Sequence, residues 1–319
     1  MEAKIRDKRI YCIINPDAGG GNSRIWWETT MPELDQRGYR YSWEYMHPGH
    51  IKEQVQTAVI EQGAEVIVVV GGDGSIFEVI NAMVEQDKLI KEGLILVVSP
   101  TGSACDFARH IYPQQPKSLP DLLEHGQIHH IDLGCCCFQQ QEAAVTKYYI
   151  NSFDTGVGAD TCFAVNDKAG KIKKILKNGQ MAFMLTALKV LMTYKYCHAR
   201  IELPEQTIEG EFIITGLGNG SYIGGGMKLF PHAALDDGLL DLLLIPRKSR
   251  LNILRLFPKV YSGDVINIAG TVYLQTPTAQ ISTQQPINIE LDGEVPGTTD
   301  AEIRVIPKLL PLLLPVNPA

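Results

Sequence analysis

The stretch from residue 66 to residue 83 joins a buried strand, a glycine-rich turn and a helix, and it constrains the fold more than any other part of the chain. Val66–Val70 is a run of five aliphatic residues, which is typical of a strand buried on both faces. The turn Gly71–Ser75 follows at once, and apolar residues then recur at helical spacing as far as Met83. Because glycine lets bare backbone N–H groups approach a phosphate, this turn predicts a nucleotide site.

Asp73 is the charged residue of this turn. A carboxylate repels a phosphate unless a cation or a hydroxyl lies between them, so Asp73 favours a nucleotide bound with Mg²⁺, or a ligand with a sugar hydroxyl. The chain has neither the lysine pattern of a Walker A loop nor the catalytic loop of protein kinases, so a nucleotide would be bound in another way. A tight turn without a ligand is the structural alternative.

Length, charge and cysteine content narrow the class of protein. The 319 residues suit two domains of roughly 100–200 residues each. The net charge of −7 argues against nucleic acid as the main partner. Seven cysteines without a Cys-x-x-Cys pair fit a reducing cytoplasm. With neither a signal peptide nor a run of roughly 18–20 apolar residues, we expect a cytoplasmic protein that meets a membrane, if at all, at its inner surface.

Strands and helices alternate along the first part of the chain. Strands are expected at Arg9–Ile14, Tyr39–Tyr45, Val66–Val70 and Leu94–Ser99, with helices between them. Such repeats predict a parallel sheet with helices on both faces and ligands at the carboxyl ends of the strands. The turns at residues 15–21, 71–75 and 100–106 follow such strands, so we expect them to converge.

Short strands dominate the second part of the chain. Their spacing, with one helical stretch at Gly179–Tyr194, predicts an antiparallel sandwich or barrel. The last segment has a strand pattern and is expected to return to the first domain. We therefore predict an α/β domain of residues 1–132 with the tail of about 305–319, and a β-rich domain of residues 133–304.

Several short motifs occur in an order typical of one family. They are Asn15-Pro16, Gly71–Ser75, Gly102–Arg109, Ile131–Gly134, Ile150–Phe153, Pro231–Asp241 and Asp292–Glu294. In these motifs the chain resembles the diacylglycerol kinase catalytic-domain family of soluble bacterial lipid kinases, which is related to sphingosine kinases and more distantly to NAD kinases. The resemblance covers nearly the whole chain. It implies an N-terminal α/β nucleotide-binding domain with a parallel sheet and a C-terminal antiparallel β-sandwich domain.

The same resemblance implies an ATP-dependent lipid kinase that uses Mg²⁺ and has its site in the cleft between the domains. The γ-phosphate would pass to a lipid hydroxyl. Diacylglycerol is the default acceptor, and a sphingoid base, a ceramide-like lipid or phosphatidylglycerol are alternatives. Glu294 would be the general base, and Asp73 would hold the catalytic Mg²⁺ directly or through water. The nucleotide-binding residues carried over from the family are Asn15, Tyr45, Gly71, Gly72, Asp73, Gly74, Ser75 and Ser103.

The resemblance also implies a second, structural Mg²⁺ site in the turn of residues 234–239. Asp237 would supply a carboxylate, and Ala234 and Leu239 would supply backbone carbonyl groups. By itself, the sequence Asp236-Asp237-Gly238 is typical of a simple hairpin turn. The motif Asp292-Gly293-Glu294 by itself is likewise typical of a solvated hairpin turn. Both alternatives stay open.

The chain departs from the family pattern at several positions. Ser75 and Ser103 replace the usual threonines but keep the hydroxyl, and Tyr45 aligns loosely with a threonine that touches the nucleotide. Cys105 replaces the usual asparagine and loses an amide that could form hydrogen bonds. Two alternatives remain: a catalytically silent nucleotide- or lipid-binding protein, because of Cys105, and a kinase of a soluble acceptor such as NAD, because NAD kinases share the Gly-Gly-Asp-Gly turn.

Two basic stretches bear on the partners. Lys168–Lys177 and Arg247–Lys259 mix cations with apolar residues, which suits an anionic membrane surface at roughly 1 kcal/mol per charge. Such runs are also common on solvated helix faces. The expected partners are a lipid substrate and transient contact with a membrane surface, without nucleic acid. A homodimer is neither favoured nor excluded.

Overall fold

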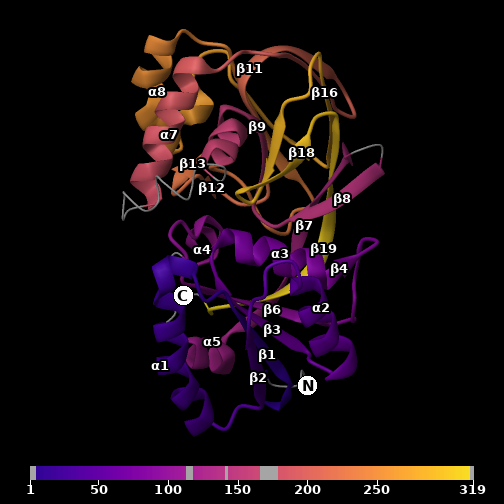
Figure 1. The fold of residues 1–319 in the computed structure, drawn as a ribbon. Helices are drawn as coiled ribbons and strands as arrows, with labels where there is room; N and C mark the ends of the chain where they lie inside the picture. Colours follow the sequence, from indigo (N-terminus) through magenta and orange to yellow (C-terminus); the bar gives the residue numbers. More distant parts are fainter. Residues whose placement is uncertain (1–4, 113–117, 141–142, 166–178, 317–319) are drawn as a thin grey trace. The chain divides into compact units, whose positions relative to one another are not determined.

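The chain forms two compact units in a computed structural model, which describes residues 5–112, 118–140, 143–165 and 179–316. The first unit is Met1–Ile131 with Lys308–Ala319, and the second is Asp132–Pro307 (Figure 1). The basic stretch Lys168–Lys177 lies outside the described residues.

The first unit is built on a parallel sheet with the strand order β2-β1-β3-β6-β19. Its strands are β1 (Ile10–Ile14), β2 (Tyr41–Tyr45), β3 (Val66–Gly71), β6 (Ile95–Pro100) and the end of β19 (Ala301–Leu314). Every pairing between these neighbours is parallel. All residues of β1 and β3 are buried, as their aliphatic runs predict. The predicted parallel α/β architecture is therefore confirmed.

Helices cover both faces of this sheet. They are α1 (Asn22–Gln36), α2 (Ile51–Gln56) with the π-helical turn η3 (Thr57–Glu61), α3 (Asp73–Met83), α4 (Asp106–Ile111) and α5 (Leu119–His125). Shorter elements are the 3-10 turns η1 (Ile5–Asp7) and η2 (Ala18–Gly21) and the small strands β4 (Val84–Glu85) and β5 (Lys88–Leu89). Helix α1 contacts α5, and α2 contacts α3. In Figure 1, α1 and α5 lie to the left of the strands and α2 to the right.

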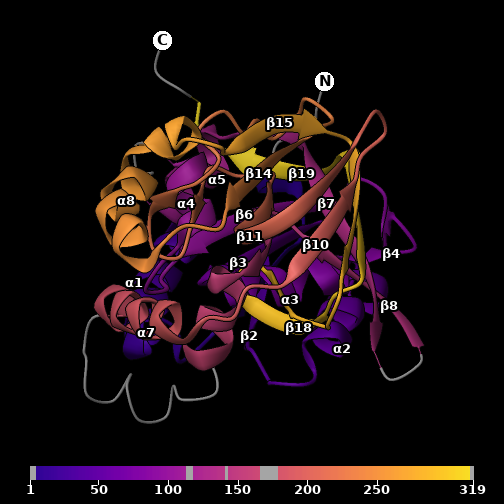
Figure 2. The same cartoon turned by 90° about the horizontal axis from the view of Figure 1, so that it is seen from above.

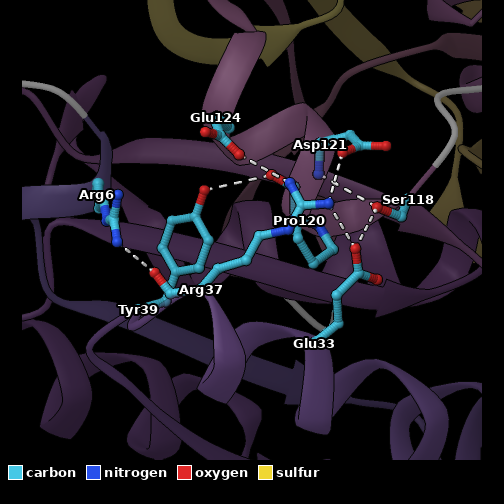
Figure 3. Close-up of polar contacts among 8 residues, drawn as sticks. All are labelled: Arg6, Glu33, Arg37, Tyr39, Ser118, Pro120, Asp121 and Glu124. Carbon is cyan, nitrogen blue, oxygen red and sulfur yellow. Dashed lines mark hydrogen bonds and ion pairs between the residues drawn. The ribbon is translucent and has the colours of Figure 1, made fainter.

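An arginine just after α1 joins that helix to α5 (Figure 3). The Arg37 guanidinium lies 2.7 Å from a carboxylate oxygen of Glu33 and 2.8 Å from those of Asp121 and Glu124. Arg6 donates a hydrogen bond of 2.7 Å to the carbonyl oxygen of Arg37. A guanidinium presents five N–H donors in a fixed planar fork, so one arginine can serve three carboxylates at once in a defined geometry.

We expect Arg37→Ala to lower the melting temperature, because three neighbouring carboxylates would lose their shared cation and repel one another. Thermal unfolding at low and high salt measures this effect, which should shrink at high salt because screening weakens partly exposed ion pairs. Arg37→Lys should recover only part of the loss. Arg40→Ala, which removes an exposed arginine nearby, is the control. Equal melting temperatures for Arg37→Ala and Arg40→Ala would contradict the prediction.

The second unit contains antiparallel sheets that are joined through a long strand, β11 (Thr207–Gly218). One sheet contains β9 (Ser152–Gly156), β14 (Leu240–Pro246), β15 (Val272–Thr276), β17 (Asn288–Leu291) and β18 (Glu294–Thr298). The other contains β10 (His198–Glu202), β16 (Thr278–Thr283), β7 (Gln127–Gln140), β8 (Ala143–Tyr149) and the start of β19. The first residues of β11 pair with β10 and its last residues pair with β9 and β14. The predicted antiparallel β-sandwich is confirmed.

Helices α7 (Gly179–Thr193) and α8 (Arg250–Ser262) lie together on one side of the strands of this unit (Figure 2). The short elements η4 (Asp264–Asn267) and β13 (Met227–Lys228) contact α8, and β12 (Tyr222–Ile223) pairs with β13. The buried core that they share with the sheet consists of Leu191, Ile213, Ile223, Leu229, Phe230, Leu243, Ile245, Val265 and Ile268. Over the described residues, no helix has the length and apolar character needed to cross a bilayer.

Candidate active site

Three turns converge at the carboxyl edge of the parallel sheet, as predicted. The Asn15 side chain, just after β1, donates a hydrogen bond of 2.8 Å to the hydroxyl of Ser75 in the turn after β3. The backbone N–H groups of Thr101 and Gly102, just after β6, donate to the carbonyl oxygen of Gly71 at 2.9 and 3.2 Å. The three turns are therefore held together by direct hydrogen bonds.

Glycine is required where these turns touch. A Cβ atom on Gly102 would lie 2.5 Å from the Cα atom of Gly72, and a Cβ atom on Gly19 would overlap the carbonyl oxygen of Thr101. Gly19, Gly20 and Gly21 have φ values of 61°, 71° and 95°, which L-residues with a side chain rarely adopt. These glycines let the three backbones approach one another closely at the sheet edge.

Asp73 has a role in this arrangement that its sequence context did not reveal. Its carboxylate accepts hydrogen bonds from the backbone N–H groups of Asp106 (3.0 Å) and Phe107 (3.1 Å), which open α4. Burial raises the pKa of Asp73 above its ordinary value, and the hydrogen bonds from backbone N–H groups oppose that rise. The backbone N–H groups of Asp73 itself and of Cys105 also interact with this carboxylate, so backbone donors occupy much of its capacity of about four acceptor positions.

Cys105 occupies a backbone conformation that disfavours cysteine. It precedes α4 with φ 51° and ψ 49°, in the left-handed region. Asparagine visits this region more readily than other non-glycine residues, which gives a physical reason for the family's usual asparagine here. Burial raises the pKa of the Cys105 thiol to about 12, so it is a neutral thiol at pH 7.

We expect Cys105→Asn to raise the free energy of unfolding by about 0.5–1 kcal/mol, because asparagine tolerates the left-handed conformation. Urea denaturation measures the change. Cys105→Ala is the matched control, since alanine removes the thiol but keeps the unfavourable φ. An equal gain for the alanine and asparagine variants would contradict the conformational explanation.

The remaining nucleotide-binding candidates lie on the same edge. Tyr45 ends β2 directly beside Ile14, and Ser103 is exposed in the turn between β6 and α4. Arg24, in the first turn of α1, places its guanidinium 4.8 Å from the centre of the Tyr45 ring. Sequence reasoning did not single out Arg24, although a cation soon after three glycines could have drawn attention to it. It adds a positive charge to a site predicted to bind phosphates.

In the second unit, Asp292-Gly293-Glu294 forms the tight turn between β17 and β18. Asp292 and Gly293 have φ values of 50° and 93°, and Leu291 pairs with Glu294, as in a two-residue hairpin loop. Asp292 is only 3 % exposed, so the solvated-turn interpretation is wrong for this residue. Glu294 is half-buried at the first position of β18.

The Asp292 carboxylate anchors this hairpin to the segment before β9. One oxygen accepts a hydrogen bond of 2.8 Å from the backbone N–H of Ile150. The other accepts hydrogen bonds of 2.9 Å from the N–H groups of Asn151 and Ser152. Three buried donors thus depend on one side chain, and this anchors the hairpin turn that ends at Glu294, two residues further along the chain.

The turn proposed as a second metal site is closed by its own hydrogen bonds. Asp237 accepts from the N–H of Leu239 and from the side-chain amide of Gln275, both at 3.0 Å. Asp132 accepts from the N–H of Gly238 at 2.7 Å. In the part of the chain that the structure describes, no group of three or more His, Cys, Asp or Glu side chains is arranged to hold a metal. A site here would therefore need backbone carbonyl ligands, such as those of Ala234 and Leu239.

The basic residues around α8 are largely engaged within the unit. Arg247 forms an ion pair of 2.7 Å with Glu211 and lies over the Tyr196 ring. Lys259 pairs with Asp264 at 2.8 Å. Cations at the start of α8 remain exposed, beside Leu251, whose exposure is 71 %.

A parallel α/β unit with converging glycine turns, followed by an antiparallel β-sandwich, is the architecture of diacylglycerol kinase and NAD kinase folds. Residues 9–136 match the diacylglycerol kinase catalytic domain, and residues 153–314 match the YegS C-terminal NAD kinase beta sandwich-like domain. The chain belongs to the diacylglycerol kinase catalytic-domain family of lipid kinases, and it is an enzyme of the lipid kinase class.

Alignments with two bacterial lipid kinases cover most of the chain. It is 31 % identical over 280 residues to "Probable lipid kinase YegS-like" of Stenotrophomonas maltophilia (strain K279a), covering 87 % of this chain and 86 % of that protein. It is 26 % identical over 310 residues to a diacylglycerol kinase of Mycobacterium tuberculosis (strain ATCC 25618 / H37Rv), covering 96 % and 95 %.

Solved structures share the fold. A diacylglycerol kinase from Bacillus anthracis str. Sterne superposes with a TM-score of 0.72 at 21 % identity, covering 96 % of this chain and 97 % of that chain. Yeast NADH kinase complexed with NADH gives a TM-score of 0.50 at 10 % identity, covering 97 % and 84 %.

Proposed function

We propose that this lipid kinase transfers the γ-phosphate of ATP to the hydroxyl of diacylglycerol or a closely related lipid. The observation that carries the proposal is the convergence of three glycine turns, with Asn15 bonded to Ser75 and Gly71 bonded to the turn after β6. Backbone N–H groups of these turns would bind the phosphates, as at other helix N-termini and glycine-rich turns. Phosphoryl transfer depends mainly on such positioning and on charge neutralisation.

The donor set suits Mg²⁺, which prefers oxygen ligands and keeps several waters. Asp73 offers an oxygen acceptor while capping α4, so we propose that it holds the ion through water. When bound, Mg²⁺ would neutralise charge on the transferring phosphoryl group. Glu294 would accept the proton from the lipid hydroxyl as its oxygen attacks the γ-phosphorus, and the bond from that phosphorus to the bridging oxygen would break so that ADP leaves. Asn15, Tyr45 and Ser103 would fix the nucleotide beside the glycine turns.

An apolar cavity in the second unit supports a lipid acceptor. Its volume is about 100 Å³, and its lining includes Val157, Leu188, Leu191, Ile213, Ile253 and Val260. Cavities of similar size hold small apolar molecules, so a longer acyl chain requires the lining helices α7 and α8 to move apart. We also propose transient membrane contact through the exposed start of α8, where Leu251 stands beside Arg250.

The test is transfer of labelled γ-phosphate from ATP to a panel of acceptors in mixed micelles. The panel contains diacylglycerol, a sphingoid base, ceramide, phosphatidylglycerol and NAD. Label on diacylglycerol at the highest kcat/KM supports the proposal, whereas label on another lipid or on NAD alone identifies a different acceptor. Nucleotide binding without transfer to any of them would contradict it and support the silent binding protein that Cys105 suggests.

A further inference from the structure

Two buried carboxylates face each other across neighbouring strands of the second unit. Asp154 on β9 and Glu290 on β17 are directly opposite in the antiparallel register. They are 1 % and 4 % exposed. Directly opposed residues project from the same face of a sheet, with Cβ atoms roughly 4.5–5.5 Å apart, so the two carboxyl groups share one buried environment.

Each carboxylate binds a backbone N–H of a different element. Asp154 accepts a hydrogen bond of 3.2 Å from Ala159, in helical residues 157–165. A Cβ atom on Gly158 would overlap the Asp154 carboxylate, so the helix approaches closely. Glu290 accepts a hydrogen bond from the N–H of Gly293, in the turn that precedes Glu294. Glu290 thus holds the second residue of that turn, whose first residue, Asp292, is anchored by its own carboxylate.

The groups around this pair are acidic or neutral. Asp160 acts electrostatically on Asp154, while Asp292 and Glu294 act on Glu290. Tyr194 also lies near Asp154 and Asp160, and the Asn288 amide donates to Asp160. Among the described residues, no ion pair involves Asp154 or Glu290.

Two ionised carboxylates in such a place would repel each other and lose their hydration without compensation. Burial raises the pKa of both, and mutual repulsion adds to the rise for Glu290. At neutral pH the pair therefore retains a proton.

We propose that Glu290 is a positioning residue for Glu294, and that it holds the turn from inside the protein because it shares one proton with Asp154. The shared proton also spares Glu294 a further negative charge beside it. The inference rests on the proposed role of Glu294 as the base. It assigns a purpose to a pair of buried carboxylates in the unit that does not contain the glycine turns.

The first test compares Glu290→Gln with Glu290→Ala, using ATP and the lipid from the panel above that gives the highest rate. Glutamine keeps an acceptor for the Gly293 N–H and offers an N–H to Asp154, so kcat should stay within about threefold of wild type. Alanine releases the turn, so kcat should fall about 10- to 100-fold while the KM for ATP is unchanged. An alanine variant with wild-type kcat would overturn the positioning role.

The second test needs no activity and remains informative if the alanine variant does not fold. In the unfolded chain both carboxyls ionise near pH 4, whereas the native pair keeps a proton to higher pH. The native state then binds more protons, so wild-type stability should fall as pH rises from 5 to 8. The unfolding equilibrium constant should change by up to about tenfold per pH unit relative to Glu290→Gln. Parallel urea midpoints for wild type and Glu290→Gln across this range would overturn the shared proton.

Glu294→Gln, assayed alongside, separates the proposed base role of Glu294 from the positioning role of Glu290. Full activity in that variant would refute the base role, and the positioning role with it. Loss of activity in Glu294→Gln together with wild-type kcat in Glu290→Ala would refute only the positioning role.

Discussion

Glu294→Gln should lower kcat for lipid phosphorylation by about 10²–10⁴, the usual contribution of a general base. The amide has the size of the carboxylate but cannot accept the hydroxyl proton. The KM for ATP should stay near the wild-type value, because the nucleotide turns lie in the other unit of the chain. Transfer of labelled phosphate to the preferred lipid, with melting temperature as a check on folding, measures the effect.

Glu302→Gln is the matched control for this substitution. Glu302 is an exposed residue of β19 in the same unit. The substitution makes the same change of charge and size at a position outside the candidate site. We expect wild-type kinetics from it. Equal kcat values for Glu294→Gln and Glu302→Gln would show that the proton is taken by another group.

Asp292→Ala should be the most destabilising of the substitutions considered, by at least about 3 kcal/mol in the free energy of unfolding. It would leave the N–H groups of Ile150, Asn151 and Ser152 without their acceptor in the protein interior. Each unsatisfied buried donor costs about 1–3 kcal/mol. Asp292→Asn should lose less, since one oxygen is kept. Urea denaturation measures both variants.

Asp300→Ala provides the comparison. Asp300 also accepts a backbone hydrogen bond, from Thr283 at 3.1 Å, but in an exposed position where water can replace it. Its loss should cost less than about 1 kcal/mol. If Asp292→Ala were as mild as Asp300→Ala, the N–H groups near Ile150 would have to find other partners.

The parallel unit could be predicted because its evidence is local. The run Val66–Val70 predicts a buried strand, and the glycines that follow predict the turn at its end. Repeated strand–helix units then imply that the turns after the strands lie at one edge of the sheet. Convergence of the turns after β1, β3 and β6 follows from that topology. The role of Asp73 as the cap of α4 could not be foreseen, because its partners are more than 30 residues away and depend on how the turns pack.

The second unit was harder to predict in detail, although its class was correct. The pairing of Asp154 with Glu290 depends on a register between strands that are far apart in sequence. The residues next to Asp154 and Glu290 in the sequence do not predict that register. Asp292 was interpreted as part of a solvated turn or as a neighbour of the base, since local turn chemistry says nothing about donors contributed by residues 150–152.

Cys105 shows a different limit. Comparison with the family pattern marked it as unusual, but only the backbone dihedral angles explain why asparagine is common at that position. The family pattern shows that asparagine is preferred at this position. The structure shows that the backbone conformation is a reason for that preference.

The close approach of Gly102 to Gly72 restricts which substitutions the two turns can accept during evolution. A Cβ atom on Gly102 would lie 2.5 Å from the Gly72 Cα atom, so a side chain there would push away the turn before α3. A Cβ atom on Gly72 would lie 3.3 Å from the Gly102 Cα atom, which is a tighter contact than usual. Descendants of this chain that acquire new acceptors are therefore expected to diversify in the β-rich unit, while the two glycines persist as a fixed pair.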